Sequence, residues 1–197
     1  MPASLLVLMT GLPAAGKSTT GRRLAEQLDL PFFDKDAVLE TLFDTLGSPT
    51  PDDRTRLSRA SDAVLAQLAE AVPSAVLSSF WRQPGMPESS GTSLDWVGRL
   101  HPARMLVEVE CRCAPETAAD RFLSRRRHPG HHDGRHTQHG LVAAFAELAA
   151  AGPVLDAEPV VVRTDQPVDV VALADEVSRR AAAGGRGGAV RPAQQRR

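Results

Sequence analysis

Short apolar runs alternate along the chain with longer stretches in which apolar residues recur every three or four positions. The runs have the length of buried strands, and they cover residues 4–10, 31–33, 75–77, 105–109 and 159–163. The longer stretches have the period of helices with one buried face, and they cover residues 17–28, 36–46, 50–73, 115–127, 141–151 and 167–183. Strands that alternate with helices favour a parallel sheet between helical layers. The pattern therefore predicts an α/β sandwich with five parallel strands.

The apolar spacing also predicts which faces of two helices are buried. The helix at 50–73 starts with a capping Thr50, with Pro51 at its first position and acids in its first turn. Its apolar residues at helical spacing are Leu57, Val64, Leu68 and Val72. In the helix at 115–127 the residues expected to point inward are Ala119, Phe122 and Leu123. A short helix at 94–100 is expected within a Pro-, Gly- and Ser-rich excursion over about 82–103.

Residues 11–18 read Gly-Leu-Pro-Ala-Ala-Gly-Lys-Ser, between the first predicted strand and the first predicted helix. The pattern G-x-x-x-x-G-K-[ST] in this context predicts a phosphate-binding loop. Gly11 and Gly16 allow a tight bend that brings backbone N–H groups close to phosphate oxygens, and the helix N-terminus adds its dipole. Lys17 is expected to reach the β- and γ-phosphates, and the Ser18 hydroxyl to ligate Mg²⁺. The alternative is a glycine-rich turn with an accidental lysine, but both flanks fit the phosphate site.

An acidic motif, Asp34-Lys35-Asp36, follows the second predicted strand at the same edge of the sheet. Phosphoryl transfer needs a positioned hydroxyl, a proton acceptor and positive charge near the phosphates. We expect Asp36 to bind the acceptor hydroxyl and Asp34 to lie near the metal, through water. Lys35 would screen charge or contact the substrate. The alternative for Asp36 is a helix cap, and the two roles can coexist.

A group of arginines leads into a histidine-rich loop. Arg121 and Arg125 are one helical turn apart and share a face, and Arg126 and Arg127 follow them. Guanidinium groups on a mobile segment can neutralise the charge of a moving phosphoryl group; a solvated basic face is the alternative. The loop that follows contains five histidines, at positions 128, 131, 132, 136 and 139. We interpret residues 124–140 as a mobile lid whose histidines contact phosphate, substrate or solvent; a metal site is the minor alternative.

Three other positions are candidates for the walls of the site. Phe80 and Trp81 end the third strand and would line the substrate pocket, although aromatic residues there can equally belong to the core. Asp165 follows the fifth strand, where adenine commonly packs in such folds; Arg163 and Thr164 are placed equally well. The residues predicted to bind the nucleotide are Gly11, Leu12, Pro13, Ala14, Ala15, Gly16, Lys17, Ser18, Thr19, Arg121 and Asp165. Cys111 and Cys113 are interpreted as small strand-end residues rather than a metal pair.

Composition narrows the function classes. The 197 residues carry a formal net charge of −1, which gives no overall attraction to nucleic acid or to a membrane surface. No apolar run approaches the roughly 20 residues that span a bilayer, and two cysteines fit a reducing cytoplasm. Residues 1–183 are expected to form one domain, either as a monomer or as a homodimer. Residues 184–197 are Arg- and Gly-rich without aromatic residues, which predicts a disordered tail and makes nucleic acid an unlikely partner.

With these motifs, residues 4–180 resemble the small P-loop kinases. The resemblance is strongest to the predicted-kinase or AAA-type ATP-binding group, with chloramphenicol phosphotransferase, polynucleotide 5′-kinase, gluconate kinase and shikimate kinase as wider relatives. It implies a three-layer P-loop NTPase fold of the nucleoside-monophosphate-kinase kind, with a mobile lid. Residues 31–40 resemble the F-x-D-x-D-x-x-[IL]-E stretch of shikimate kinases, which implies that Asp34 lies near magnesium and Asp36 binds the acceptor hydroxyl. Arg121 and Arg125 match the lid arginines of polynucleotide kinases, and residues 127–131 are similar to a stretch of the predicted-kinase group.

The chain departs from these relatives at the end of the third strand. Many of them carry an acid there that holds Mg²⁺ through water, whereas this chain has Ser78-Ser79. The glycine triplet of shikimate kinases is also absent, which argues against shikimate as the substrate. Ser18 and Asp34 are then the expected metal-binding residues, with Ser79 as a further candidate.

Together these features predict an ATP- and Mg²⁺-dependent kinase that acts on a hydroxyl of a small molecule. Lys17, Arg121 and Arg125 would stabilise the transferred group, and Asp36 would orient or deprotonate the acceptor. Lys35, Phe80 and Trp81 complete the predicted substrate site. Two alternatives remain open: a kinase of nucleosides or polynucleotide ends, and a P-loop NTPase switch without a small-molecule acceptor.

Overall fold

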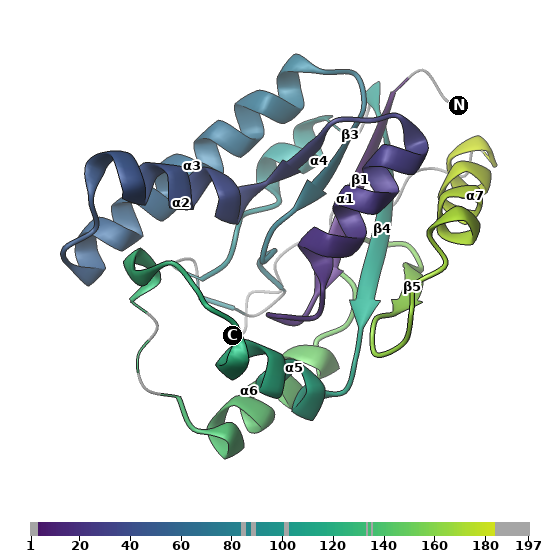
Figure 1. Cartoon of the computed structure of the whole chain (residues 1–197). Helices are drawn as coiled ribbons and strands as arrows, with labels where there is room; N and C mark the ends of the chain where they lie inside the picture. Colours follow the sequence, from purple (N-terminus) through teal and green to yellow (C-terminus); the bar gives the residue numbers. More distant parts are fainter. Residues whose placement is uncertain are drawn as a thin grey trace, which may run out of the picture.

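The computed structural model describes residues 4–83, 86–87, 90–100, 103–132, 134 and 136–183. Figure 1 shows strands and helices alternating along most of the chain. The strands are β1 (Leu5–Gly11), β2 (Phe32–Asp34), β3 (Ala75–Ser78), β4 (Met105–Arg112) and β5 (Val160–Arg163). The α-helices are α1 (Lys17–Leu28), α2 (Lys35–Leu46), α3 (Pro51–Ala71), α4 (Asp95–Leu100), α5 (Pro115–Ser124), α6 (Gln138–Ala150) and α7 (Val170–Ala182).

The five strands form one parallel sheet in the order β2-β3-β1-β4-β5. β1 lies at the centre, and its first six residues are buried, as expected of a parallel strand that helices cover on both faces. The carboxyl ends of all five strands lie at one edge of the sheet, because the strands are parallel. The α/β class and the five-stranded parallel sheet predicted from the sequence are confirmed.

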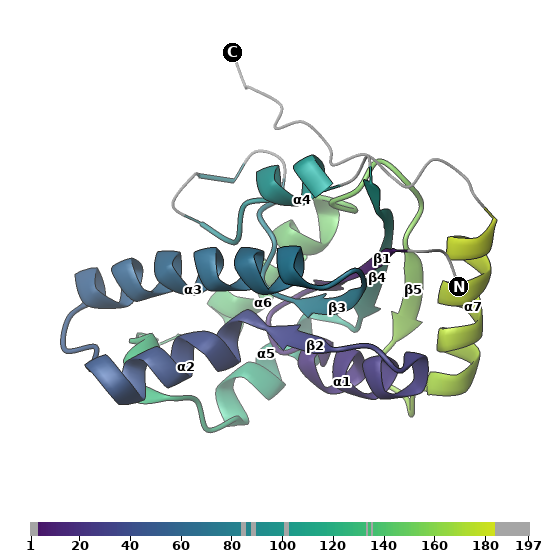
Figure 2. The same ribbon diagram turned by 90° about the horizontal axis from the view of Figure 1, so that it is seen from above.

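The side chains of β1 alternate between two core clusters, and this alternation sets the layers. Leu5, Val7 and Met9 pack with α1 and α7, together with parts of α5 and α6. Leu6 and Leu8 face the opposite side, where α3 and α4 cover the sheet. Figure 2 shows α3 and α4 on one side of the sheet and α1 and α7 on the other. The fold is therefore a three-layer sandwich with the phosphate loop at its centre.

The helix α3 starts as predicted, but a different face is buried. The Thr50 side chain accepts a hydrogen bond from the Asp53 backbone N–H, and Pro51 is the first helical residue. The buried residues are Leu57, Ser61, Leu65 and Ala69. The prediction for Val64 was wrong, because its side chain is 40% exposed. Ser61 lies within the buried stripe, so the spacing of apolar residues alone does not reveal which face of the helix is buried.

The segment predicted as the lid, residues 124–140, is slightly shorter in the structure, because the helix before it ends at Ser124 and the helix after it begins at Gln138. α5 ends at Ser124, and Arg125 already has extended backbone angles, so the predicted helix at 115–127 was too long. Leu123, expected to point inward, is 47% exposed. α6 then begins at Gln138, where the Thr137 side chain accepts a hydrogen bond from the backbone N–H of Gly140. The segment between the two helices is therefore residues 125–137.

Parts of the excursion are tied to the sheet edge. Trp81 and Thr92 form an isolated bridge, the Arg82 N–H donates to the Thr92 carbonyl, and the Thr92 N–H donates to the Phe80 carbonyl. The short helix α4 lies where it was predicted. The tail prediction, residues 184–197, lies outside the described residues. Within the described chain, no helix is both long and apolar enough to cross a bilayer.

Candidate functional site

The phosphate loop connects β1 to α1 in a tight turn. Gly11 has φ +120°, and a Cβ at this position would lie 2.2 Å from the Cys111 carbonyl oxygen, so only glycine fits. Gly16 caps α1 with φ 87° in the left-handed region, where glycine is favoured. Lys17 curls over the loop, and its Nζ donates to the Gly11 carbonyl at 2.9 Å and the Leu12 carbonyl at 2.8 Å. The loop thus holds its lysine in place through its own carbonyl groups.

The Lys17 ammonium lies in a mixed electrostatic environment. Burial lowers its pKa, and the negative charges of Asp36 and Asp34 act in the opposite direction. The lysine therefore lies within electrostatic reach of both carboxylates of the acidic motif. The predicted partners of phosphate and acceptor come together in one site.

The residues of the loop divide between the site and the core. The residues that line the cavity at the sheet edge are Pro13, Ala14, Gly16, Lys17, Ser18 and Thr19. Leu12 and Ala15 are buried in the core cluster beneath the loop, and Gly11 packs against Cys111. These three can contribute only backbone groups to a ligand.

The acidic motif folds so that its two carboxylates have different partners. Asp34 ends β2 and caps α2, because its Oδ1 accepts a hydrogen bond from the Asp36 N–H at 3.0 Å. The alternative that Asp36 is the cap was therefore wrong. Burial raises the pKa of Asp34, while a hydrogen bond from the Ser18 side chain opposes the shift. The Ser18 hydroxyl and the Asp34 carboxylate, the two predicted metal-binding groups, are thus neighbours.

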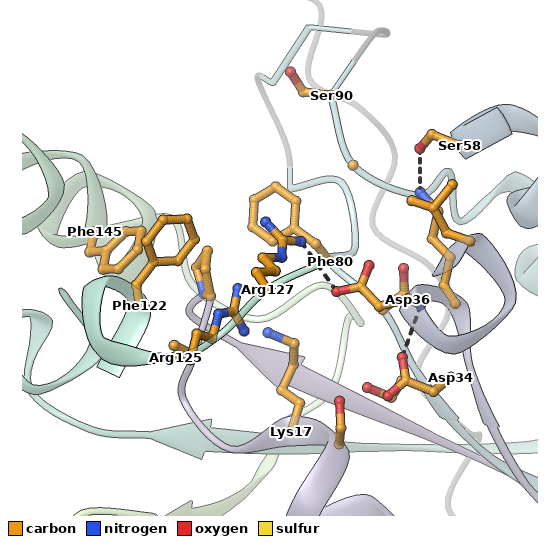
Figure 3. Close-up of a pocket in the computed structure, with 18 of the residues that line it drawn as sticks. Lys17, Asp34, Asp36, Ser58, Phe80, Ser90, Phe122, Arg125, Arg127 and Phe145 are labelled. Carbon is orange, nitrogen blue, oxygen red and sulfur yellow. Dashed lines mark hydrogen bonds and ion pairs between the residues drawn. The ribbon is translucent and has the colours of Figure 1, made fainter. Parts of the chain in front are cut away.

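Asp36 lies in the first turn of α2 with its side chain 51% exposed. Figure 3 shows its carboxylate facing the space between Lys17 and Arg127. Lys35 points away toward α3, where its Nζ lies 3.1 Å from Asp62 and donates to the Ser58 hydroxyl at 2.9 Å. The charge of Lys35 is therefore balanced within the protein, although the residue lines the cavity.

Asp62 also organises the end of β3, and the sequence analysis missed it. The Thr92 hydroxyl donates to Asp62 at 2.7 Å, and the Ser79 and Thr92 hydroxyls share a hydrogen bond. Ser79 is buried, so its hydroxyl serves this network rather than standing free as a metal ligand. Nothing in the local sequence marks Asp62, because it lies in the middle of α3 and meets its partners only in the folded chain.

Arginines from the last turn of α5 and from the segment that follows it line the same cavity. Arg121 donates to the Thr164 carbonyl at 2.8 Å, and the Arg125 guanidinium carbon lies 4.9 Å from the centroid of the Phe122 ring. The Arg127 guanidinium lies 3.4 Å from the Asp36 carboxylate. All three arginines line the cavity, whereas Arg126 is exposed outside its lining.

The histidines that follow contact α2 instead of the phosphate region. His128 lies 3.0 Å from Asp44, and the buried His131 lies 3.0 Å from Glu40. The Phe43 ring packs against both imidazoles, with centroid distances of 5.3 and 5.2 Å. His132 contacts the Ser48 carbonyl. We call residues 127–132 the docking segment.

The histidines of the docking segment make other contacts than those predicted for the lid histidines. Of the five, His136 alone lines the cavity. Within the described residues, no three His, Cys, Asp or Glu side chains gather as a metal site; Asp133 and residue 135 lie outside them. His128 and His131 therefore anchor the lid to α2, and His132 anchors it to the loop after α2, so none of the three faces a phosphate.

The cavity has a volume of about 1210 Å³ and lies at the carboxyl edge of the sheet. Its walls come from the phosphate loop, the first turn of α2, α3, the end of β3, α5 and α6. Phe80 lines it as predicted. Trp81 does not: it is 3% exposed, and its indole N–H donates to the Met9 carbonyl at 2.9 Å. Trp81 belongs to the core.

The residues after β5 that were candidates for a nucleotide contact lie in different surroundings. Thr164 approaches the phosphate loop, 3.7 Å from a Cβ built on Gly16. Asp165 pairs instead with Arg163 at 2.5 Å, which lowers the pKa of the Asp165 carboxyl, and it is not among the lining residues. The placement of Asp165 thus gives its predicted nucleotide contact no support in this conformation.

Two buried groups behind the site have structural roles. Both cysteines are free thiols, and burial raises the pKa of Cys111 to about 11, so this thiol stays protonated at neutral pH. Glu108 of β4 accepts hydrogen bonds from the Thr10 hydroxyl and from the backbone N–H groups of Val154 and Leu155. Glu108 therefore fixes the loop after α6 to the centre of the sheet.

A glycine-rich phosphate loop at the central strand of a five-stranded parallel sheet, with lid arginines above it, defines a P-loop nucleotide-binding fold. The family model described as AAA domain (AAA_33) matches residues 6–148, and the chain belongs to this family of P-loop kinases.

Three relatives illustrate the similarity. A solved protein from Chloroflexus aurantiacus J-10-fl, described provisionally as a kinase, is 26% identical; the match covers 90% of this chain and 98% of that one, with a TM-score of 0.73. A gluconokinase from Sinorhizobium meliloti 1021 shares the fold at 22% identity, covering 92% and 95% of the two chains with a TM-score of 0.55. Among curated proteins, the shikimate kinase of Rhodococcus jostii (strain RHA1) is 61% identical over 33 residues. That match spans 17% of this chain and 20% of the relative.

Proposed function

We propose that the protein is an ATP- and Mg²⁺-dependent kinase that transfers the γ-phosphoryl group to a hydroxyl of a small molecule. The observation that carries the proposal is that Lys17, Asp36 and the lid arginines line one cavity. In Figure 3 Lys17, Arg125, Arg127 and Asp36 surround the same space. The gluconokinase and shikimate kinase named above support a small-molecule acceptor. The two buried free thiols fit a reducing compartment, and we place the enzyme in the cytoplasm.

The donor half of the site consists of the phosphate loop and α5. Backbone N–H groups of the loop and the N-terminus of α1 would bind the phosphates, and Lys17 would exchange its loop carbonyl partners for the β- and γ-phosphate oxygens. Arg121 and Arg125 would neutralise charge that develops on the moving group. Both arginines already line the cavity, which lowers the cost of reorganisation during transfer.

Ser18 and Asp34 fit the metal that this chemistry requires. A hydroxyl and a carboxylate are the oxygen ligands that Mg²⁺ prefers, and both residues line the same cavity. When bound there, Mg²⁺ would supply positive charge that offsets the charge of the phosphates. Because burial raises the pKa of Asp34, the cation would bind best when this carboxyl is ionised.

The acceptor half of the site is organised around Asp36. Its half-exposed carboxylate can accept the proton of a hydroxyl that lies between it and the phosphate loop. The hydroxyl oxygen bonds to the γ-phosphorus while the bond from that phosphorus to its bridging oxygen breaks. ADP leaves with the electron pair, and the hydroxyl proton passes to Asp36.

A second candidate is a kinase of nucleosides or polynucleotide ends. The observation in its favour is that Phe80 and several arginines line the cavity together, because aromatic rings stack on bases and arginines contact phosphates. Salt-dependent binding of a short oligonucleotide would support this candidate. Equal binding at low and high salt would count against it.

The direct test is a screen of candidate alcohols with γ-labelled ATP, using Lys17→Ala as a control that removes the phosphate contact. The proposal expects transfer of label to at least one alcohol by the natural protein and none by the variant. ATP hydrolysis that no alcohol stimulates, with no labelled alcohol formed, would instead indicate a P-loop NTPase switch.

A further inference from the structure

One face of α3 is polar and lines the cavity. Its lining residues are spaced at three to four positions, so they share one side of the helix, and they are Arg54, Thr55, Ser58, Arg59 and Asp62. The neighbouring stripe of the same helix, which includes Leu57 and Leu65, is buried. The sequence alone does not point to this face as part of the site, because a polar stripe on an amphipathic helix usually faces solvent.

The positive charges on this side of the cavity are not all balanced. Lys35 is paired with Asp62, and Arg127 with Asp36. Arg54 and Arg59 form no ion pair with any described residue. The acceptor side of the site therefore presents two guanidinium groups without a countercharge.

Arg54 carries the strongest signal for a ligand. Its Nε is buried and has no hydrogen-bond partner among the described residues, although the residue lines the cavity. A buried N–H without a partner costs free energy, more so on a charged group. A guanidinium matches the paired oxygens of a carboxylate or phosphate. An anion in the cavity would satisfy both the orphaned N–H and the uncompensated charge.

The Arg54 and Arg59 guanidinium groups come from a different part of the cavity wall than the groups expected to bind the nucleotide phosphates. The donor contacts come from the phosphate loop and α5, whereas Arg54 and Arg59 come from α3. Figure 3 shows Ser58, one turn after Arg54 on α3, on the far side of Asp36 from Lys17. An anion at the α3 face would therefore be a second charged group, beyond the reacting hydroxyl.

We propose that the acceptor is an anionic alcohol, whose carboxylate or phosphate group binds Arg54 and Arg59 while its hydroxyl faces Asp36. This inference rests on the proposed function, because it names the acceptor class of the same site. It excludes neutral sugars and simple polyols as preferred acceptors. The α3 arginines are binding and specificity residues in this scheme and take no part in proton transfer.

The first test compares matched alcohols that differ only in charge. Glycerol, glycerate and glycerol 3-phosphate form one set, and D-glucose, D-gluconate and D-glucose 6-phosphate form another. The proposal expects ATP-dependent phosphorylation of anionic members only, and the carboxylate and phosphate arms identify which anion is used. Preferred phosphorylation of a neutral member would overturn the anion site while leaving the kinase proposal intact.

The second test assigns the effect to α3. Arg54→Gln should raise the KM for the anionic acceptor by about tenfold or more, as the loss of charge-assisted hydrogen bonds predicts, and leave the KM for ATP within about twofold. Arg56→Gln is the matched control, because Arg56 lies on the same helix but is 76% exposed and pairs with Asp53. An unchanged acceptor KM in Arg54→Gln would overturn the proposal.

A binding measurement tests the anion site on α3 even if no alcohol in the panel is phosphorylated. With the phosphate loop saturated by a non-hydrolysable ATP analogue, inorganic phosphate is titrated into the natural protein, Arg54→Gln and Arg56→Gln. The proposal expects binding that is weakened by about fivefold or more in Arg54→Gln alone. Phosphate binding that is absent, or equal in all three proteins, would refute the anion site. The failure of the alcohol panel alone would weigh against the proposed function instead.

Discussion

The Arg127 guanidinium lies 3.4 Å from the Asp36 carboxylate, and this contact joins the lid to the first turn of α2. The same helix presents two further acids to the lid. Glu40 and Asp44 follow Asp36 at intervals of four residues, and they meet His131 and His128. The lid is thus held along one face of α2, and its first contact is made with the residue that we propose binds the acceptor.

Substitution of Arg127 should impair transfer more than nucleotide binding. Arg127→Gln removes the charge that holds the Asp36 carboxylate toward the lid, and misplaced catalytic groups cost about tenfold or more in kcat. Arg126→Gln is the control, because Arg126 is a neighbouring exposed arginine outside the cavity lining. Steady-state kinetics on an accepted alcohol provides the measurement. Equal kcat values for both variants would show that the Arg127 contact has no role in transfer.

Docking of the lid should depend on the absence of a side chain at residue 130. A Cβ at Gly130 would lie 2.5 Å from the Phe43 ring, so Gly130→Ala should push the docking segment away from α2. Hydrogen exchange of the backbone amides of residues 128 and 130–132 should become faster by about tenfold or more, since local opening exposes these amides. Gly134→Ala is the control, because a Cβ there meets nothing within 4 Å. Unchanged exchange in Gly130→Ala would contradict the docked arrangement.

Glu108 should be a stability residue. In Glu108→Gln one oxygen becomes an amide NH₂, which would face a backbone N–H of Val154 or Leu155 instead of accepting from it. The free energy of unfolding should fall by about 1–3 kcal/mol. Glu110→Gln, which affects only a surface pair with Arg112, should change it by less than about 0.5 kcal/mol. Chemical denaturation measures both, and equal values would remove Glu108 from the core network.

The contribution of Glu108 should also depend on pH in a defined direction. Burial raises the pKa of Glu108 above the ordinary value of 4.5, so the folded protein keeps this proton to higher pH than the unfolded chain. In that window the unfolded state binds fewer protons, and the free energy of unfolding falls as pH rises. The difference in stability between the natural protein and Glu108→Gln should therefore decrease from pH 4.5 upward. A difference that increases over this range would reverse the assignment.

The central architecture could be predicted because its signals are local. The phosphate loop carries its glycines, lysine and serine within eight residues, and the buried strands are continuous apolar runs. The face of α3 was misjudged because Ser61 interrupts the buried stripe, while Val64 looks apolar yet is exposed. Apolar spacing alone does not rank two overlapping stripes on one helix.

Contacts between distant segments could not be predicted in the same way. His131 and Glu40 are 91 residues apart in sequence, and His128 and Asp44 are 84 apart. Their pairing depends on where the lid crosses α2, which no local pattern encodes. The same limit applies to Trp81, because an aromatic residue after a strand can face either the site or the core. Here the indole faces the core, where its N–H donates to the Met9 carbonyl.

In the proposed mechanism Asp36 serves the acceptor and is not needed to hold the nucleotide. This role can be measured as phosphoryl transfer and ATP affinity in Asp36→Asn, compared with the natural protein on the same alcohol. Transfer should fall by about a hundredfold or more, while the Kd for ATP should stay within about threefold. Retained transfer, or loss of ATP binding together with transfer, would contradict the role given to Asp36.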